Sequence, residues 1–222
     1  MVVKDCNFSV QKGEMIGLMG ESGSGKSTLA KLLIGLEKPS QGQVLLDGQP
    51  YSVKKSGVRI LLVFRDSLHS VNPNFTVDQV LTEALPKDVA REEIEAILED
   101  VGLDKSYRTQ PARQLSGGQL QRICIARGLL LKPDVLIFDE ALSGLDPIVQ
   151  GRLLRLLYDL WEKYQLTYLF ISHDFKLSYA LCHRILVMAD GEIVDEIKDF
   201  ELPIQAHHPV TKKLIGDKGH FS

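Results

Sequence analysis

Glycine and serine predominate in a short run that ends in a lysine and two hydroxyl residues. It reads Gly20-Glu21-Ser22-Gly23-Ser24-Gly25-Lys26-Ser27-Thr28, which fits the eight-position phosphate-loop pattern. In that pattern the glycines let successive backbone N–H groups curl around phosphate oxygens. We expect Lys26 to neutralise the β- and γ-phosphates of a nucleotide, and the hydroxyl of Ser27 to bind Mg²⁺. The residues predicted to bind the nucleotide here are Gly20, Ser22, Gly23, Ser24, Gly25, Lys26, Ser27 and Thr28.

Two adjacent carboxylates follow a second short apolar run. Residues 135–138 predict a buried strand, and Asp139 and Glu140 come directly after it. We expect Asp139 to hold Mg²⁺ through water and Glu140 to polarise an attacking water as a general base. His173 follows another apolar run and is predicted to contact the γ-phosphate or that water. The predicted catalytic residues are Glu140, His173 and Lys26, and the predicted metal ligands are Ser27 and Asp139.

Each of these motifs also has a purely structural reading. A glycine-rich turn can bind nothing, many strands end in acids, and a lone histidine is more often structural. The strand expected before the glycine run and the helix expected after it favour the chemical reading. The presence of Lys26, Asp139 and His173 in one chain favours it further.

A third motif, Leu115-Ser116-Gly117-Gly118-Gln119, precedes a helix predicted at residues 120–130. Its glycines and serine expose N–H and hydroxyl donors at a helix start, which makes a second phosphate-binding surface. Two such surfaces around one γ-phosphate are redundant within one chain. We therefore expect each surface to engage a nucleotide that another subunit holds. The predicted nucleotide-binding residues here are Ser116, Gly117, Gly118 and Gln119.

Hydrophobic spacing predicts the elements that position these motifs. Strands are expected at residues 6–10, 15–19, 43–47, 60–64, 135–138, 168–172 and 184–188, helices at 27–35 and 147–164, and a turn at 48–50. Asp190-Gly191 predicts a closing hairpin. We expect one α/β domain over residues 1–222, with a mostly helical insert at 66–130 and a peripheral tail at 200–222.

Composition narrows the possible partners. The 222 residues are 44% hydrophobic, enough for one sizeable core, and 26 basic against 29 acidic residues give a net charge of −3. That balance does not indicate a nucleic-acid partner. The three cysteines lie too far apart for a disulfide framework or a zinc site. No stretch approaches the ~20 apolar residues that span a bilayer, so a membrane role requires partner subunits.

The ordered set of these motifs resembles the ABC ATPase family over nearly the whole chain. Ser143-Gly144-Leu145-Asp146, between the carboxylate pair and His173, completes the set. The resemblance implies a P-loop NTPase (RecA-like) core with an inserted helical subdomain and a small antiparallel β portion. It also implies ATP and Mg²⁺ as cofactors, and two ATPase subunits that sandwich two ATPs head to tail. Asp146 would then lie in the loop that crosses their interface.

Two segments resemble the ATPases of peptide and nickel importers. One is Val63-Phe64-Arg65-Asp66-Ser67-Leu68-His69-Ser70-Val71-Asn72-Pro73, and the other is the tail His208-Pro209-Val210-Thr211-Lys212-Lys213-Leu214-Ile215. An ordinary Asn-Pro turn and a solvated tail are the structural alternatives. The resemblance implies an ATP-hydrolysing subunit, peripheral at the cytoplasmic face of the cell membrane, that energises import of nickel, a metal chelate, dipeptides or oligopeptides. Its implied partners are a different second ATPase subunit, two transmembrane permease subunits and an extracytoplasmic solute-binding protein.

Two features depart from the family pattern. Arg65 replaces a glutamine whose carbonyl reaches Mg²⁺, and arginine has no acceptor atom, so slower hydrolysis is expected. A harmless substitution on a loop is the alternative. The aromatic residue with which the family stacks adenine has no counterpart before Gly20, because Phe8 comes too late in the chain. Either adenine is held loosely or the chain is a truncated or mis-started version.

Three rival functions stay open at this point. They are a soluble ABC protein of translation or DNA repair, an exporter ATPase, and a partner subunit that binds ATP but hydrolyses it poorly. The first usually has tandem cassettes or long coiled-coil insertions, and neither is visible in these 222 residues. Asn72-Pro73 and His208-Pro209 argue against the exporter.

Overall fold

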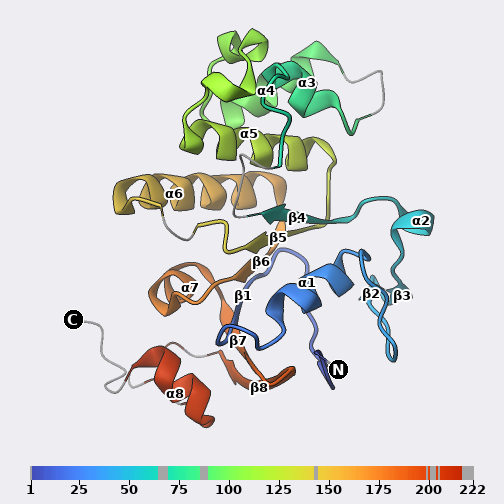
Figure 1. The fold of residues 1–222 in the computed structure, drawn as a ribbon, viewed down its shortest axis with the longest axis vertical. Coiled ribbons are helices and arrows are strands. Elements are labelled where there is room, and N and C mark those ends of the chain that lie inside the picture. Colours follow the sequence, from blue (N-terminus) through green and yellow to red (C-terminus); the bar gives the residue numbers. More distant parts are fainter. Residues whose placement is uncertain are drawn as a thin grey trace.

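A six-stranded sheet forms the centre of the molecule (Figure 1). The computed structural model describes residues 2–64, 70–85, 90–142, 145–198, 200, 204 and 206–216. The strands of this sheet are β1 (Met15–Met19), β4 (Ile60–Phe64), β5 (Val135–Asp139), β6 (Thr167–Ile171), β7 (Arg184–Ala189) and β8 (Glu192–Ile197). Their order is β4-β5-β6-β1-β7-β8, and all neighbours run parallel except β7 and β8. The predicted α/β fold class is confirmed, as is the closing hairpin.

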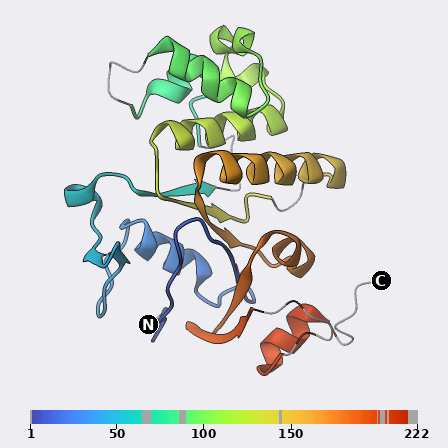
Figure 2. The ribbon, with the colours of Figure 1, turned by 180° about the vertical axis from the view of Figure 1, so that it is seen from behind.

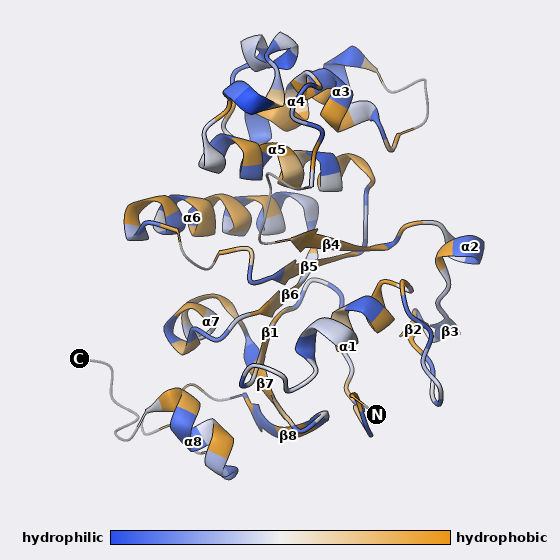
Figure 3. Ribbon diagram, in the orientation of Figure 1, coloured by the Kyte–Doolittle hydropathy of each residue, from blue (hydrophilic) through white to orange (hydrophobic). Residues whose placement is uncertain are grey.

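Helices cover the sheet on both sides, as the views from front and back show (Figure 2). The helices are α1 (Lys26–Leu33), α2 (Val53–Ser56), α3 (Val77–Thr82), α4 (Arg91–Asp100), α5 (Gly117–Leu130), α6 (Pro147–Tyr164), α7 (Phe175–Leu181) and α8 (Pro209–Ile215). The predicted helix at residues 147–164 is therefore confirmed. Hydrophobic residues gather on the central strands and on parts of the helices (Figure 3).

Burial on both faces explains why the parallel strands are apolar along their whole length. In β1, Ile16 and Leu18 belong to the core on the side of α1. Met15 and Met19 belong to the opposite core, together with buried residues of α5, α6 and α7. Successive side chains of one strand thus enter different cores, so the strand has no face left for polar residues.

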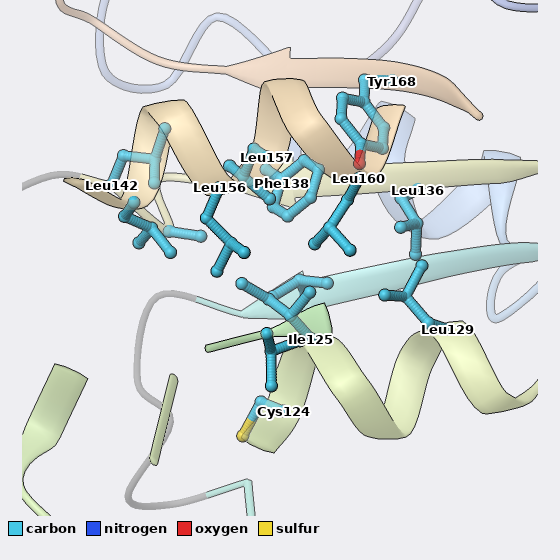
Figure 4. Packing of buried hydrophobic residues seen from close by; sticks show 14 of the residues in the cluster. Cys124, Ile125, Leu129, Leu136, Phe138, Leu142, Leu156, Leu157, Leu160 and Tyr168 are labelled. Atoms are coloured by element: carbon cyan, nitrogen blue, oxygen red, sulfur yellow. The ribbon is translucent and has the colours of Figure 1, made fainter. Parts of the chain in front are cut away.

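The rings of Phe138 and Tyr168 lie among aliphatic side chains in the core beside α6 (Figure 4). The ring of Phe138 on β5 stacks on the ring of Phe170, with 5.0 Å between the ring centroids. Phe138 and Tyr168 form a T-shaped pair with 5.2 Å between their centroids. Leu157 and Leu160 of α6 pack in the same cluster beside Phe138. These contacts hold β5 and β6 in place, and both strands end at the chemical motifs.

The described chain between β4 and β5 forms no strands, only helices and short turns. Helices α3 and α4 pack on α5. Arg108 joins the first two, because its guanidinium donates to Asp78 at 2.8 Å and to Glu95 at 2.7 Å. These helices lie within the predicted insert at residues 66–130, whose boundaries stay a prediction.

The strand predicted at residues 6–10 is wrong, because these residues pair with no strand. Their alternation has another cause. Cys6, Phe8 and Val10 are half-buried against the core on the side of α1, whereas Asn7 and Ser9 between them are exposed. An extended segment that lies on a core alternates like a strand without sharing a hydrogen-bonded ladder.

The strand predicted at residues 43–47 is shorter than expected. Only β2 (Leu45–Leu46) is a strand there, and it pairs antiparallel with β3 (Gln49–Pro50). The turn falls at Asp47-Gly48, where both residues have positive φ, and not at residues 48–50. Helices α2, α7 and α8 were not predicted, because four to seven residues show at most two turns of helical periodicity.

One core hydroxyl gives a stability prediction. Oη of Tyr168 is fully buried and has no hydrogen-bond partner among the described residues. An unpaired buried polar group costs about 1–3 kcal/mol, so Tyr168→Phe should raise the free energy of unfolding by about 1 kcal/mol after the small void is counted. Urea unfolding measures this. As a contrast, Tyr179→Phe removes a 3.1 Å bond to the Phe200 carbonyl and should destabilise. Equal decreases in the free energy of unfolding for both variants would contradict the conclusion that the Tyr168 hydroxyl is unpaired.

Candidate functional site

The phosphate loop, residues 20–28, joins the end of β1 to α1. Nζ of Lys26 donates to the carbonyl oxygens of Gly20 and Glu21, both at 2.8 Å. A third bond, of 3.3 Å, reaches Oγ of Ser24. The loop therefore wraps around its own lysine. Since these acceptors are neutral, an anion beside Lys26 would form stronger, charge-assisted bonds.

The turn between β7 and β8 supports the phosphate loop through backbone contacts. The N–H of Gly191 donates to the carbonyl of Ser24 at 3.0 Å. A Cβ on Gly20, where φ is 156°, would lie 2.2 Å from the carbonyl oxygen of Met188. Only glycine allows the loop to approach β7 so closely.

A cavity of about 460 Å³ opens in front of the loop. It is lined by Val2, Ser22, Gly23, Gly25, Lys26, Ser27, Thr28, Asp139, Glu140 and His173. Gly20 and Ser24 do not line the cavity, because Gly20 packs against Met188 of β7 and the carbonyl of Ser24 contacts Gly191 in the β7–β8 turn. Val2 does line it, and nothing in the sequence around Val2 signals this. The cavity unites motifs that are more than 140 residues apart in the chain.

Burial shifts the charges of two groups in this cavity. It raises the pKa of the Asp139 carboxyl, and the hydrogen bond from Ser27 opposes that rise only in part. Burial likewise lowers the pKa of the Lys26 ammonium, against the attraction of Glu140 and Asp139. Both shifts favour neutral forms. A cation beside Asp139 and an anion beside Lys26 would each restore the charged form.

Glu140 and His173 contact each other at the mouth of the cavity. Nδ1 of His173 lies 2.9 Å from Oε1 of Glu140, and the histidine side chain is 66% exposed. Glu140 has a φ of +53°, and its N–H donates to the carbonyl of Ile171 on β6 at 2.9 Å. The bond to Ile171 holds the backbone of Glu140 in the left-handed region, and this conformation gives its side chain a defined direction.

The oxygen donors of the cavity fit Mg²⁺. The Ser27 hydroxyl and the Asp139 carboxylate lie together, and both are hard ligands. The described residues contain no group of three or more His, Cys, Asp or Glu arranged to hold a metal ion. Such a sparse set suits Mg²⁺, which keeps water and takes one or two protein oxygens together with substrate phosphates.

The residues predicted from the third motif, Ser116 to Gln119, do not line this cavity. They form the start of α5. Oγ of Ser116 accepts from the N–H of Gln119 at 3.3 Å, and Oε1 of Gln119 accepts from the N–H of Ser116 at 2.8 Å. A Cβ on Gly117 would meet nothing within 4 Å, whereas a Cβ on Gly118 would lie 3.8 Å from Cγ1 of Val149, so this helix start is open at Gly117. Binding of a phosphate by this surface stays a prediction.

Several predicted features lie elsewhere or beyond the described residues. Oδ1 of Asp146 accepts from the N–H of Ile148 at 2.9 Å and so caps α6. Arg65, Ser143 and Gly144 lie outside the described residues. Of the helices that the described residues form, none has both the length and the apolar character needed to cross a membrane.

Comparison with known proteins identifies relatives over the whole chain. Residues 3–143 match the family described as ABC transporter. The chain is 43% identical to the uncharacterized ABC transporter ATP-binding protein YejF of Escherichia coli K12, over 97% of the chain. That alignment covers only 43% of YejF, so the chain spans less than half the length of this relative.

Two further relatives are named as import proteins. The nickel import ATP-binding protein NikE of Shigella dysenteriae is 41% identical over 87% of the chain and 77% of NikE. The metal-staphylopine import system ATP-binding protein CntF of Staphylococcus aureus is 38% identical over 96% of the chain and 88% of CntF.

Solved structures agree with this family. CbiO1 of Clostridium perfringens, part of the ABC transporter complex cbiONQ, has a TM-score of 0.79 and 29% identity, and the match covers 88% of this chain and 81% of CbiO1. The ATP-binding cassette MJ0796, in a post-hydrolysis state bound to ADP and Pi, has a TM-score of 0.74 and 28% identity over 89% of this chain and 90% of MJ0796. The predicted P-loop NTPase fold is confirmed.

The support of the loop by β7 gives a prediction with a matched control. Gly20→Ala should lower the free energy of unfolding by at least ~2 kcal/mol, because its Cβ meets a backbone oxygen that cannot move aside. Gly23→Ala should cost only the strain of its positive φ, about 1 kcal/mol, since a Cβ there meets nothing within 4 Å. Urea unfolding of both variants measures the difference. If Gly20→Ala were no worse than Gly23→Ala, the close packing of the loop on β7 would be disproved.

Proposed function

The chain belongs to the ABC transporter family of ATPases, and from this premise we propose that it binds ATP with Mg²⁺ in the cavity beside the phosphate loop and hydrolyses it to drive import across a membrane. The observation that carries the proposal is the convergence of Lys26, Asp139, Glu140 and His173 on one cavity. Lys26 is a phosphate-binding cation and Asp139 is a metal ligand. Glu140 is a general base that is hydrogen-bonded to His173. Phosphoryl transfer from a nucleotide to water uses each member of this set.

Lys26 supplies the charge that binds the β- and γ-phosphates. Its three neutral partners in the loop keep the ammonium in place before ATP arrives. Phosphate oxygens then replace them, and the charge-assisted bonds are stronger than those they replace. Gly23, Gly25 and the first residues of α1 line the same cavity, and their N–H groups are the further donors to phosphate in this proposal. Ser22, Ser27 and Thr28 complete the predicted phosphate contacts.

Glu140 acts as the general base. Its carboxylate takes a proton from the attacking water, and its bond to His173 holds it at the mouth of the cavity. His173 is exposed enough for its other nitrogen to reach a γ-phosphate oxygen. Ser27 and Asp139 hold Mg²⁺, which when bound supplies the charge that neutralises the phosphate oxygens during transfer.

The start of α5 serves a second subunit in this proposal. Ser116, Gly117, Gly118 and Gln119 do not line the chain's own cavity, yet their helix start is open at Gly117. A helix start of this kind favours an anion. This supports a paired arrangement in which Ser116 to Gln119 of one ATPase subunit meet the nucleotide of the other.

Nickel or a nickel chelate is the proposed cargo, with peptides as the second candidate. Relatives at 41% and 38% identity are named for nickel and metal-staphylopine import, which favours an importer over an exporter or a soluble ABC protein. Such a system needs two transmembrane permease subunits and an extracytoplasmic solute-binding protein, with this chain peripheral at the cytoplasmic face. A different second ATPase subunit completes the proposed assembly.

Removal of the proposed base tests hydrolysis. Glu140→Gln keeps the shape of the side chain but cannot accept a proton, so ATP turnover by the assembled transporter should fall about 10²-fold or more. Affinity for ATP should persist, because Lys26 and the loop are unchanged. Steady-state phosphate release and nucleotide binding measure the two effects.

Glu99→Gln on α4 is the matched control, since Glu99 is exposed and does not line the cavity. It should leave turnover unchanged. If Glu140→Gln also left total turnover unchanged, the chain would be a partner subunit that completes the site of another ATPase.

Uptake measurements in the host test the cargo. Deletion of the gene should lower uptake of radioactive nickel, and the wild-type gene but not the Glu140→Gln gene should restore it. Dipeptide uptake should not change. Unchanged nickel uptake together with lost dipeptide uptake would show that the cargo is a peptide.

A further inference from the structure

Helix α8 lies near strand β8 (Figure 1), and the carboxylate of Asp195 on β8 anchors it. Oδ2 of Asp195 accepts from Oγ1 of Thr211 at 2.6 Å. It also accepts from the N–H groups of His207 at 3.1 Å and His208 at 2.8 Å. Thr211 is fully buried. These contacts fix the start of α8, because two backbone N–H groups just before or at its N-cap and one hydroxyl in its first turn converge on one oxygen.

The anchored helix brings a lysine to the phosphate loop. Nζ of Lys213 lies 2.5 Å from Oε1 of Glu21. Glu21 is part of the loop itself, since its carbonyl accepts from Nζ of Lys26 at 2.8 Å and from the N–H of Ser24 at 3.2 Å. The pair therefore joins α8 directly to the residues that surround Lys26.

The charge of Glu21 explains why such a contact matters. A carboxylate in a loop that binds phosphate repels the ligand, and the next residue, Ser22, lines the cavity. Lys213 offsets that charge, and its hydrogen bond and charge lower the pKa of the Glu21 carboxyl. Both side chains are exposed, 47% for Glu21 and 76% for Lys213, so the effect is modest and depends on salt.

We propose that Lys213 is a positioning residue for nucleotide binding, which holds Glu21 toward α8 and neutralises its charge beside the phosphate loop. The inference rests on the proposed binding of ATP in this cavity. It extends the binding site to the segment after β8, which none of the chemical motifs includes. Lys213 touches neither ATP nor the reacting atoms, so it changes affinity and not the chemical step.

A double-mutant cycle tests this inference. The dissociation constant for a fluorescent ATP analogue is measured with the full chain for wild type, Lys213→Ala, Glu21→Gln and the double variant. Lys213→Ala should bind roughly two- to fivefold more weakly, because it leaves the Glu21 charge unpaired. The double variant should recover wild-type affinity, because the charge that Lys213 offsets is gone.

Further measurements separate this role from a merely structural one. Lys212→Ala removes one positive charge from the same helix, and Lys212 forms no ion pair with the described residues. The Lys212→Ala variant should therefore bind the analogue as tightly as wild type. Lys213→Arg should restore binding. The effect of Lys213→Ala should disappear at about 1 M salt, where the Debye length is about 3 Å. For Lys213→Ala, the melting temperature and kcat should equal those of wild type, whereas KM should rise.

Equal affinities of Lys213→Ala and Lys212→Ala at low salt would overturn the inference, as would a double variant that binds no better than Lys213→Ala. In both cases the wild-type chain still binds the analogue, so the proposed function stands. A wild-type chain that binds no analogue would overturn the proposed function and this inference with it.

Discussion

The hydrogen-bonded ladder between β5, β6 and β1 brings the chemical groups together. Ile171 on β6 pairs with Asp139 on one side and with Leu18 on the other, so the three strands end at the same height. The N–H groups of Glu140 and Ser172 continue the ladder beyond the strands. Because parallel strands end at one edge of the sheet, the loop after β1, the acids after β5 and the histidine after β6 meet there.

The sequence predicts the parts of this arrangement that depend on contiguous residues. Glycine, lysine and hydroxyl residues in a fixed spacing predict the phosphate loop, and apolar runs predict β1, β4 and β5. The bond between Glu140 and His173 depends on the register of two strands, which no local pattern encodes. The place of Val2 at the cavity likewise depends on how a distant segment lies on the core. Roles in catalysis stay predictions for all of these residues.

The parts that were missed share a physical cause. Short helices such as α8 are stabilised by tertiary contacts, here the bonds of Asp195 to Thr211 and the preceding backbone, and not by their own periodicity. The false strand at residues 6–10 shows the reverse, because burial gave it the alternation of a strand without a partner. In both cases the deciding contacts lie more than ten residues away in the chain.

The central claim is that the cavity exchanges the internal bonds of Lys26 for bonds to ATP. A crystal structure with Mg²⁺ and a non-hydrolysable ATP analogue tests it most directly. We expect Nζ of Lys26 to leave the carbonyl oxygens of Gly20 and Glu21 and to contact the β- and γ-phosphates, with the metal beside Ser27 and Asp139. A nucleotide bound elsewhere, or a Lys26 that keeps both carbonyl bonds beside the bound phosphates, would contradict the account.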